Sequence, residues 1–218
     1  MTESEGAAPT IADEASLRTR YRDPTPAVQA KSRPCVDERA AAFVAASPLM
    51  VLATASADGT DASPRGGPPG FVVVLDPEHV AFGDLSGNNR LDSYGNLLQN
   101  PKVGMLFLLP GSGETLRING TALLTDPPEV LDATTIDRAR PKVAVVVEVE
   151  ECFVHCAKAL RRSGIWDPTS WPSDDDRPSG AEVIVDQFQL DVDAEVVEAG
   201  LEADYQATIW EPGGRSEA

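Results

Sequence analysis

One segment of the sequence combines the residue types that hold phosphate in proteins. Residues 85–91 follow an apolar stretch, carry one glycine and two asparagines, and lead directly into an amphipathic helix. The first turn of a helix presents unpaired N–H groups and a partial positive charge, which favour an anion. Glycine and asparagine tolerate left-handed backbone that turns N–H groups inward, and Arg90 adds a guanidinium suited to phosphate oxygens. The same residues would also form an ordinary capping loop with Asn88 or Asn89 as the N-cap.

A second candidate site lies at residues 63–71, which read Ser-Pro-Arg-Gly-Gly-Pro-Pro-Gly-Phe. Arg65 stands at the end of an expected strand, and the residues after it forgo backbone pairing because proline has no N–H group to donate. Their free backbone groups would suit a planar ligand, which glycines allow to approach closely. The alternative is an edge strand that prolines protect against aggregation.

The sequence Cys152-Phe153-Val154-His155-Cys156 suggests a metal site at first sight. Zinc would need a fourth ligand, and the two cysteines are four residues apart instead of the usual three. A catalytic Cys–His pair is not favoured either, because adjacent residues on a strand or helix point apart. We therefore expect packed thiols and no metal.

Three basic residues, Lys158, Arg161 and Arg162, lie at helical spacing with Trp166 close behind them. They could bind an anion, or they could compensate the helix dipole. The acidic run at residues 174–176 is expected to be a solvated loop instead of a cation site.

The charge of the chain excludes two classes of partner. Its 218 residues include 35 acidic and 18 basic residues, which give a formal net charge of −17. Such a surface opposes non-specific binding to nucleic acid and to anionic lipid. The odd cysteine count, the acidic start of the chain and the lack of a long apolar run predict a soluble cytoplasmic protein without a secretory signal.

Hydrophobic patterning predicts the elements that position these residues. Residues 1–10 are polar and are expected to be disordered. Alternating or apolar runs bounded by turn residues predict strands within seven ranges, residues 49–55, 60–65, 71–75, 80–82, 103–109, 115–125 and 143–149. Helical spacing predicts helices within residues 11–21, 35–47, 91–99 and 154–163. Hairpin-linked strands with few helices indicate a mainly β fold, a small antiparallel barrel with flanking helices.

The order of these motifs resembles a known family. The segments that carry the resemblance are Asp58-Gly59, Ser63-Pro64-Arg65-Gly66, Phe82-Gly83-Asp84 with Gly87-Asn88-Asn89-Arg90, Asn96-Leu97-Leu98 with Asn100-Pro101, Glu114 to Gly120, and Cys152 to Ala159. Together they are similar to the pyridoxamine 5'-phosphate oxidase-like family of FMN-binding split barrels over about residues 35–166. The likeness is to a bacterial branch of uncharacterised members more than to the oxidase itself.

The resemblance implies a homodimer of split β-barrels with two FMN sites at the subunit interface. Carried over by position, the residues expected to bind FMN are Arg65, Gly66, Gly67, Phe82, Gly83, Asp84, Asn88, Asn89, Arg90, Ser93, Asn96, Arg117, Lys158, Arg161 and Trp166. Arg65 and the turn at residues 88–90 would hold the phosphate, whereas Lys158, Arg161 and Trp166 would reach across from the second subunit. No catalytic residue is assigned, because the flavin ring would carry the redox step.

The sequence departs from the family pattern at two places. The family has an arginine–lysine pair where this chain has Asn89 and Arg90. The C-terminal substrate-binding motif of the oxidase is absent, so oxidation of vitamin B6 is not expected. The expected function is an FMN-dependent oxidoreductase that transfers hydride to or from a small molecule. The alternatives are a non-catalytic protein that binds flavin, haem or deazaflavin on the same fold, and a metal-binding or structural protein that uses residues 152–156.

Three regions are expected along the chain. Residues 1–34 form an N-terminal extension that is partly disordered or helical. Residues 35–166 form the FMN-binding split barrel, and residues 167–218 form a polar extension that packs on the barrel or on the dimer partner.

Overall fold

The computed structural model describes residues 11–211 in two units, divided between Ser32 and Arg33. The expectation for residues 1–10 therefore lies outside the described residues. The first unit holds two short helices, α1 (Glu14–Arg18) and α2 (Pro26–Gln29). The helix predicted within residues 11–21 is confirmed over five residues, and it starts where the Asp13 side chain accepts a hydrogen bond from the Ser16 N–H.

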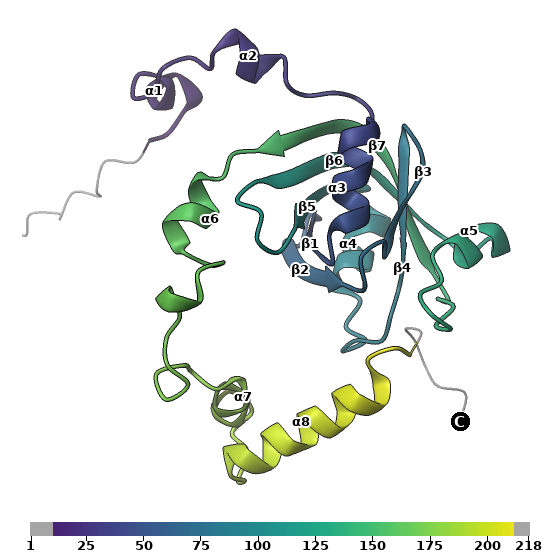
Figure 1. The fold of residues 1–218 in the computed structure, drawn as a ribbon, viewed down its shortest axis with the longest axis vertical. Helices are drawn as coiled ribbons and strands as arrows, with labels where there is room; N and C mark the ends of the chain where they lie inside the picture. Colours follow the sequence, from purple (N-terminus) through teal and green to yellow (C-terminus); the bar gives the residue numbers. More distant parts are fainter. Residues whose placement is uncertain (1–10, 212–218) are drawn as a thin grey trace, which may run out of the picture. The chain divides into compact units, whose positions relative to one another are not determined.

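The described part of the second unit contains seven strands in one antiparallel sheet (Figure 1). The strands are β1 (Leu49–Ala55), β2 (Thr60–Gly66), β3 (Val72–Asp76), β4 (His79–Gly83), β5 (Lys102–Leu108), β6 (Thr115–Thr125) and β7 (Ala144–His155). Their order across the sheet is β2-β1-β5-β6-β7-β4-β3. The mainly β prediction is confirmed, and each of the seven predicted strand ranges overlaps one of these strands.

The sheet curls around a core that lies on one of its faces. Alternate residues of the central strands are buried, as period-two alternation requires. The largest fully buried side chains are Phe82, Phe107, Met50, Leu52, Met105, Leu116, Ile118, Val44, Val72, Val80, Val145 and Val147. The helix α3 (Glu38–Ala46) contributes Val44 to this core and packs against β3, β6 and β7. It lies inside the predicted range 35–47 and begins at the N-cap Asp37.

The sheet does not close into a complete barrel. Its two edge strands are β2 and β3, and the segment between them contains the glycines and prolines at positions 66–70. The prediction that this segment breaks the ladder is confirmed, because β2 ends at Gly66 and β3 begins at Val72. The helix α4 (Asp92–Gln99) packs on β1 and β2 at this open side. The opening between the edge strands therefore provides the space for a site.

One predicted helix is wrong at its start. Residues 154 and 155 extend β7, where Val154 pairs with Leu116 and His155 with Thr115, and the helix α6 covers only Lys158–Ser163. Pairing with the long strand β6 overrides the helical spacing of this stretch, because the added residue pairs extend the antiparallel ladder.

Several helical elements were not predicted. They are α2, α5 (Pro128–Ala133), a 3₁₀ turn (Pro168–Ser170), α7 (Gly180–Phe188) and the 15-residue helix α8 (Ala194–Thr208). A sequence signal existed for α7, because Ser179 and Glu182 form a capping box. Within residues 11–211, no helix is both long enough and apolar enough to cross a bilayer.

Candidate functional site

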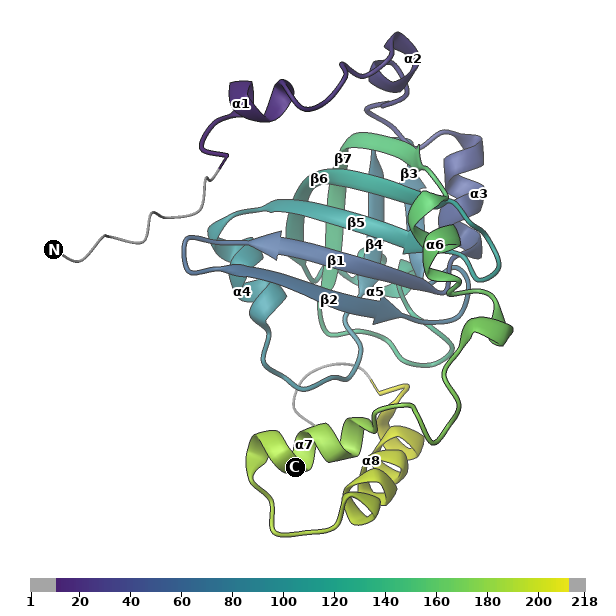
Figure 2. The same cartoon turned by 90° about the vertical axis from the view of Figure 1, so that its left-hand side faces the viewer.

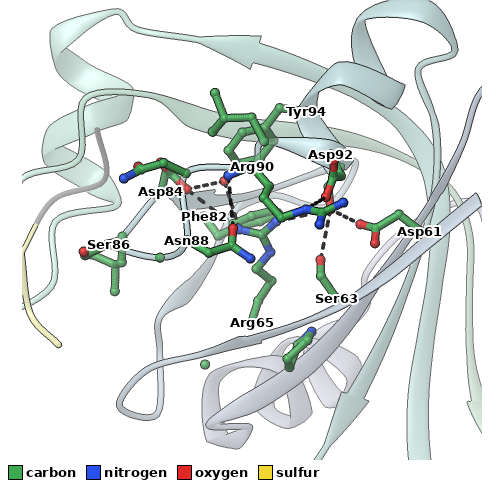
Figure 3. Close-up of a pocket in the computed structure, with 18 of the residues that line it drawn as sticks. Asp61, Ser63, Arg65, Phe82, Asp84, Ser86, Asn88, Arg90, Asp92 and Tyr94 are labelled. Carbon is green, nitrogen blue, oxygen red and sulfur yellow. Dashed lines mark hydrogen bonds and ion pairs between the residues drawn. The ribbon is translucent and has the colours of Figure 1, made fainter. Parts of the chain in front are cut away.

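A cavity of about 360 Å³ lies at the open side of the sheet (Figure 3). Its walls come from β2, from the end of β4 with the loop after it, and from the first turn of α4. The lining residues are Asp61, Ser63, Pro64, Arg65, Gly66, Phe71, Phe82, Gly83, Asp84, Leu85, Ser86, Gly87, Asn88, Asn89, Arg90, Leu91, Asp92, Ser93 and Tyr94. The two segments that the sequence singled out as candidate ligand sites thus meet in one place.

The loop before α4 leaves the start of that helix without a side-chain cap. Asn89 and Leu91 adopt left-handed backbone, with φ of 55° and 60°, and Leu91 is the N-cap residue. The capping interpretation with Asn88 or Asn89 as N-cap is therefore wrong, because the Asn88 carboxamide oxygen instead accepts a hydrogen bond from the Arg90 N–H at 3.1 Å. A helix start without a side-chain cap and a turn with left-handed residues both suit an anion.

Arg65 is held in place by three side chains of the cavity. Its Nη1 donates to the Tyr94 hydroxyl at 3.2 Å, its Nη2 donates to Ser93 Oγ at 3.3 Å, and its guanidinium lies 5.1 Å from the centre of the Tyr94 ring. Asp84 adds an ion pair at 3.8 Å. The Arg65 Nε, however, is buried and has no hydrogen-bond partner. A buried donor without a hydrogen-bond partner costs free energy of folding, so we expect this N–H to find a partner in a bound ligand.

Tyr94 links Arg65 to Asp84. Its hydroxyl donates to Asp84 Oδ1 at 2.6 Å. Burial raises the pKa of Tyr94, and the Asp84 carboxylate raises it further, although the charge of Arg65 acts in the opposite direction. The phenol therefore stays neutral and acts as a fixed donor.

A second chain of hydrogen bonds crosses from β2 to α4. Ser93, which is only 2% exposed, donates its hydroxyl to Asp61 Oδ2 at 2.5 Å and lies 3.0 Å from Ser63 Oγ. Residues 61, 63 and 65 share the inner face of β2, where the exposure of the strand alternates. This arrangement positions Arg65 from the strand and Ser93 from the helix.

The charges in the cavity are nearly balanced. Arg90 donates from Nε to Asp92 Oδ2 at 2.7 Å, and its side chain is 72% exposed at the cavity mouth. In Figure 3 the arginines Arg65 and Arg90 lie between Asp84 on one side and Asp61 and Asp92 on the other. Two positive side chains therefore face three negative ones.

The part of the chain that forms this cavity matches the model of a known protein family. The family model described as pyridoxamine 5'-phosphate oxidase matches residues 36–156, more than half of the chain, and this range includes every residue that lines the cavity. The chain belongs to the pyridoxamine 5'-phosphate oxidase family. The resemblance seen in the sequence is thereby confirmed.

Solved structures with a similar fold include three bacterial proteins. The chain is similar to HupZ of Group A Streptococcus (17% identity, TM-score 0.45, 55% of this chain and 93% of that one). It is also similar to an FMN-binding protein of Syntrophomonas wolfei (12%, 0.41, 51% and 80%). The third is a protein related to general stress protein 26 from Clostridium acetobutylicum (12%, 0.41, 53% and 84%). None of the curated proteins matches the chain.

In this member of the pyridoxamine 5'-phosphate oxidase family, nine of the predicted site residues line the cavity. They are Arg65, Gly66, Phe82, Gly83, Asp84, Asn88, Asn89, Arg90 and Ser93. Two more lie behind its walls. The Asn96 amide donates to Thr54 Oγ1 and so anchors α4 to β1. A Cβ at Gly67 would lie 2.6 Å from that of Phe71, so only glycine lets Phe71 reach the cavity.

Of the other four predicted residues, Arg117 lines a second, apolar cavity that we call the groove, Lys158 and Arg161 lie on α6 beside it, and Trp166 follows α6 in the chain. The groove measures about 420 Å³ and is lined by the outer face of β1, β5 and β6 together with His155 and α6; its residues are Val51, Ala53, Gly104, Met105, Leu106, Leu108, Thr115, Arg117, Asn119, His155, Cys156, Ala159 and Leu160. Figure 2 shows this face of the sheet with α6 at one end. A single chain does not bring these four residues into the lining of the first cavity.

Arg117 lies in the groove lining, bonded to Asn119 and 5.6 Å from the Phe153 ring centre. Trp166 donates its indole N–H to the Ser112 carbonyl at 2.7 Å. Lys158 and Arg161 lie on α6.

The cysteine-rich segment forms no metal centre in the described residues, where no group of three or more His, Cys, Asp or Glu is arranged to hold a metal ion. Cys152 is buried, and burial raises its pKa to about 11. The packed-thiol prediction is thus confirmed for Cys152. It is wrong for Cys156, which is exposed beside the groove because β7 ends just before it.

Sequence reasoning missed Asp61 and Tyr94, and it named Ser63 only as part of the candidate segment 63–71. A signal was present for Asp61 and Ser63, because they lie four and two residues before Arg65 and so share its face of a strand. Tyr94 follows Ser93 in the first turn of α4, yet only the tertiary structure shows that its hydroxyl meets Arg65.

Proposed function

We propose that the protein binds FMN in the cavity beside Arg65 and acts as an FMN-dependent oxidoreductase on a small molecule, as a homodimer. The single observation that carries the proposal is the buried Arg65 Nε without a partner, which lies in the family's shared segment and beside the open start of α4. Membership of the family supports flavin over other ligands.

The cavity holds side chains suited to a phosphate and others suited to a planar ring. Arg65, Arg90 and the turn before α4 supply positive charge and backbone donors for the phosphate. Phe71 and Phe82, which are both buried, supply apolar surface for the ring. The donors and the apolar surface would thus hold FMN in one orientation.

FMN, when bound, supplies a ring that exchanges hydride with a substrate. The chain's own residues would bind the cofactor, orient it and exclude water. Tyr94 and Asp84 keep the guanidinium of Arg65 fixed, so that it need not reorganise when the ligand enters. No described side chain need act as a nucleophile.

A second copy of the chain would complete the site. In a single chain, Arg117, Lys158, Arg161 and Trp166 lie outside the lining of the cavity, and the family resemblance predicts that residues of the partner subunit reach the flavin. The groove is lined mostly by aliphatic side chains on the outer face of the sheet, and burial of such surface favours association. The homodimer therefore explains both the apolar groove and the separation of the predicted site residues.

The test is the visible spectrum of the purified protein after incubation with FMN and removal of unbound ligand. A flavin absorption band with one FMN per chain supports the proposal, whereas no retained flavin contradicts it. Bleaching of the band by NADH or NADPH without oxygen, and its return on addition of an electron acceptor, distinguishes an enzyme from a binding protein. Mass spectrometry of the extracted ligand separates FMN from a deazaflavin or haem.

A further inference from the structure

The cavity's own carboxylates already occupy several of its donors. Ser93 donates its hydroxyl to Asp61 at 2.5 Å, and Tyr94 donates its hydroxyl to Asp84 at 2.6 Å. Arg90 Nε donates to Asp92 at 2.7 Å. A ligand phosphate must therefore compete with three internal anions for the same donors.

Asp61 differs from the other two carboxylates in how it is balanced. Asp84 and Asp92 each form an ion pair with an arginine, Arg65 at 3.8 Å and Arg90 at 2.7 Å. Among the described residues, Asp61 has no ion pair within 4 Å and accepts its hydrogen bond from a neutral hydroxyl; the charge of Arg90 acts on it only from a longer distance. Of the three carboxylates that line the cavity, Asp61 is thus the one without a direct ion pair to a described residue.

Two effects of Asp61 act against a doubly charged ligand. Its charge repels the phosphate oxygens across the cavity. Its hydrogen bond also withdraws the proton of Ser93, whose oxygen already accepts from Arg65 Nη2, so Ser93 has no proton left to donate to a phosphate.

Resting on the proposed function, we infer that Asp61 is a specificity-determining residue, which lowers the affinity of the cavity for a phosphorylated flavin relative to a flavin that ends in a neutral hydroxyl. The ligand class follows from this charge. The cavity of the natural chain discriminates weakly between FMN and riboflavin, because the gain from Arg65 and Arg90 is offset by Asp61.

The experiment titrates FMN and riboflavin into the full-length wild-type protein and into Asp61→Asn, with quenching of flavin fluorescence as the readout. Asparagine has nearly the same shape and keeps an oxygen that accepts from Ser93. We expect Asp61→Asn to bind FMN about tenfold more tightly, since a unit charge next to a dianion is removed. Riboflavin affinity should change by less than about twofold, because its hydroxyl end carries no charge.

The matched control is Asp58→Asn, in the same hairpin. It removes one negative charge, replaces the Asp-Gly turn by Asn-Gly, which hairpins also favour, and lies outside the cavity lining. Equal changes for FMN and riboflavin, weaker FMN binding in Asp61→Asn, or the same gain in Asp58→Asn would each overturn the inference while the proposed function stands. Failure of both variants and of the wild-type protein to bind either flavin overturns the proposed function and this inference with it. Thermal unfolding of the three proteins shows whether the fold is retained.

Discussion

The cavity and the groove differ in the polarity of the side chains that line them. In the cavity, charged and polar side chains are joined by hydrogen bonds between residues of the same chain. In the groove, apolar side chains such as Val51, Leu106 and Leu108 are only half-buried. This difference supports the proposals that the cavity binds a small ligand and that a second copy of the chain covers the groove.

The strongest way to break this comparison is to place a charge in the groove. Leu108→Glu should convert the dimer into monomers and raise its dissociation constant by at least about a hundredfold, because burial of an unpaired carboxylate costs several kcal/mol. Light scattering during size-exclusion chromatography measures the mass. Leu123→Glu is the control, since Leu123 is 64% exposed on β6 and lies outside the groove lining. An unchanged mass in Leu108→Glu would show that the groove is no interface between copies.

The second test concerns the positive charge of Arg65. Arg65→Ala should weaken FMN binding by about 1.5–3 kcal/mol, because it removes charge-assisted hydrogen bonds to the ligand. Isothermal titration calorimetry measures the loss. Arg140→Ala, which removes an arginine paired with Asp132 outside the cavity lining, should leave affinity unchanged. Equal affinity in the Arg65 variant and the wild-type protein would mean that the phosphate lies elsewhere.

Tyr94 provides a pH-dependent test of the same network. Its pKa in the folded protein lies above the ordinary value of 10.0, so its contribution to stability is complete below about pH 10. Above that pH the unfolded chain loses the phenol proton first, and the free energy of unfolding should fall by up to about 1.4 kcal/mol per pH unit. Urea denaturation between pH 9 and pH 11 should show a shallower fall for Tyr94→Phe. Parallel curves for the two proteins would contradict burial of the phenol.

Arg90 should give the smallest effect. Its side chain is 72% exposed and is already bonded to Asp92, so Arg90→Ala should weaken FMN binding by less than about threefold. The same titration used for Arg65 measures it, with Arg90→Lys as the conservative comparison. A loss as large as that of Arg65→Ala would show that the loop closes over the ligand and buries Arg90.

Local sequence patterns were sufficient where one residue type dictates one geometry. The predicted ranges of β1 and β6 are those of the structure, because apolar alternation and flanking turn residues mark both ends. Patterns were insufficient where two structures were locally possible. Residues 154 and 155 have helical spacing, yet they extend β7 because β6 is long enough to pair with them.

The candidate site divides in the same way. The sequence identified Arg65 and the loop at residues 85–91 as separate candidates, since arginine, glycine and asparagine have local preferences that can be recognised without a fold. It also assigned Arg117 to the same site as these residues, although one chain places Arg117 in the groove. Distances between strands depend on the curvature of the sheet, which no local pattern encodes.

The sequence by itself determined the strand-rich fold, the family and the residues able to hold a phosphate, because these depend on residue type and spacing along the chain. Only the tertiary structure decided that Asp61, Ser93 and Tyr94 surround Arg65 and occupy its neighbouring donors. The physical reason is that hydrogen bonds and charge interactions depend on separation in space and not on separation along the chain. Arg65 on β2 contacts Ser93 and Tyr94 on α4, which lie 28 and 29 residues further along the chain.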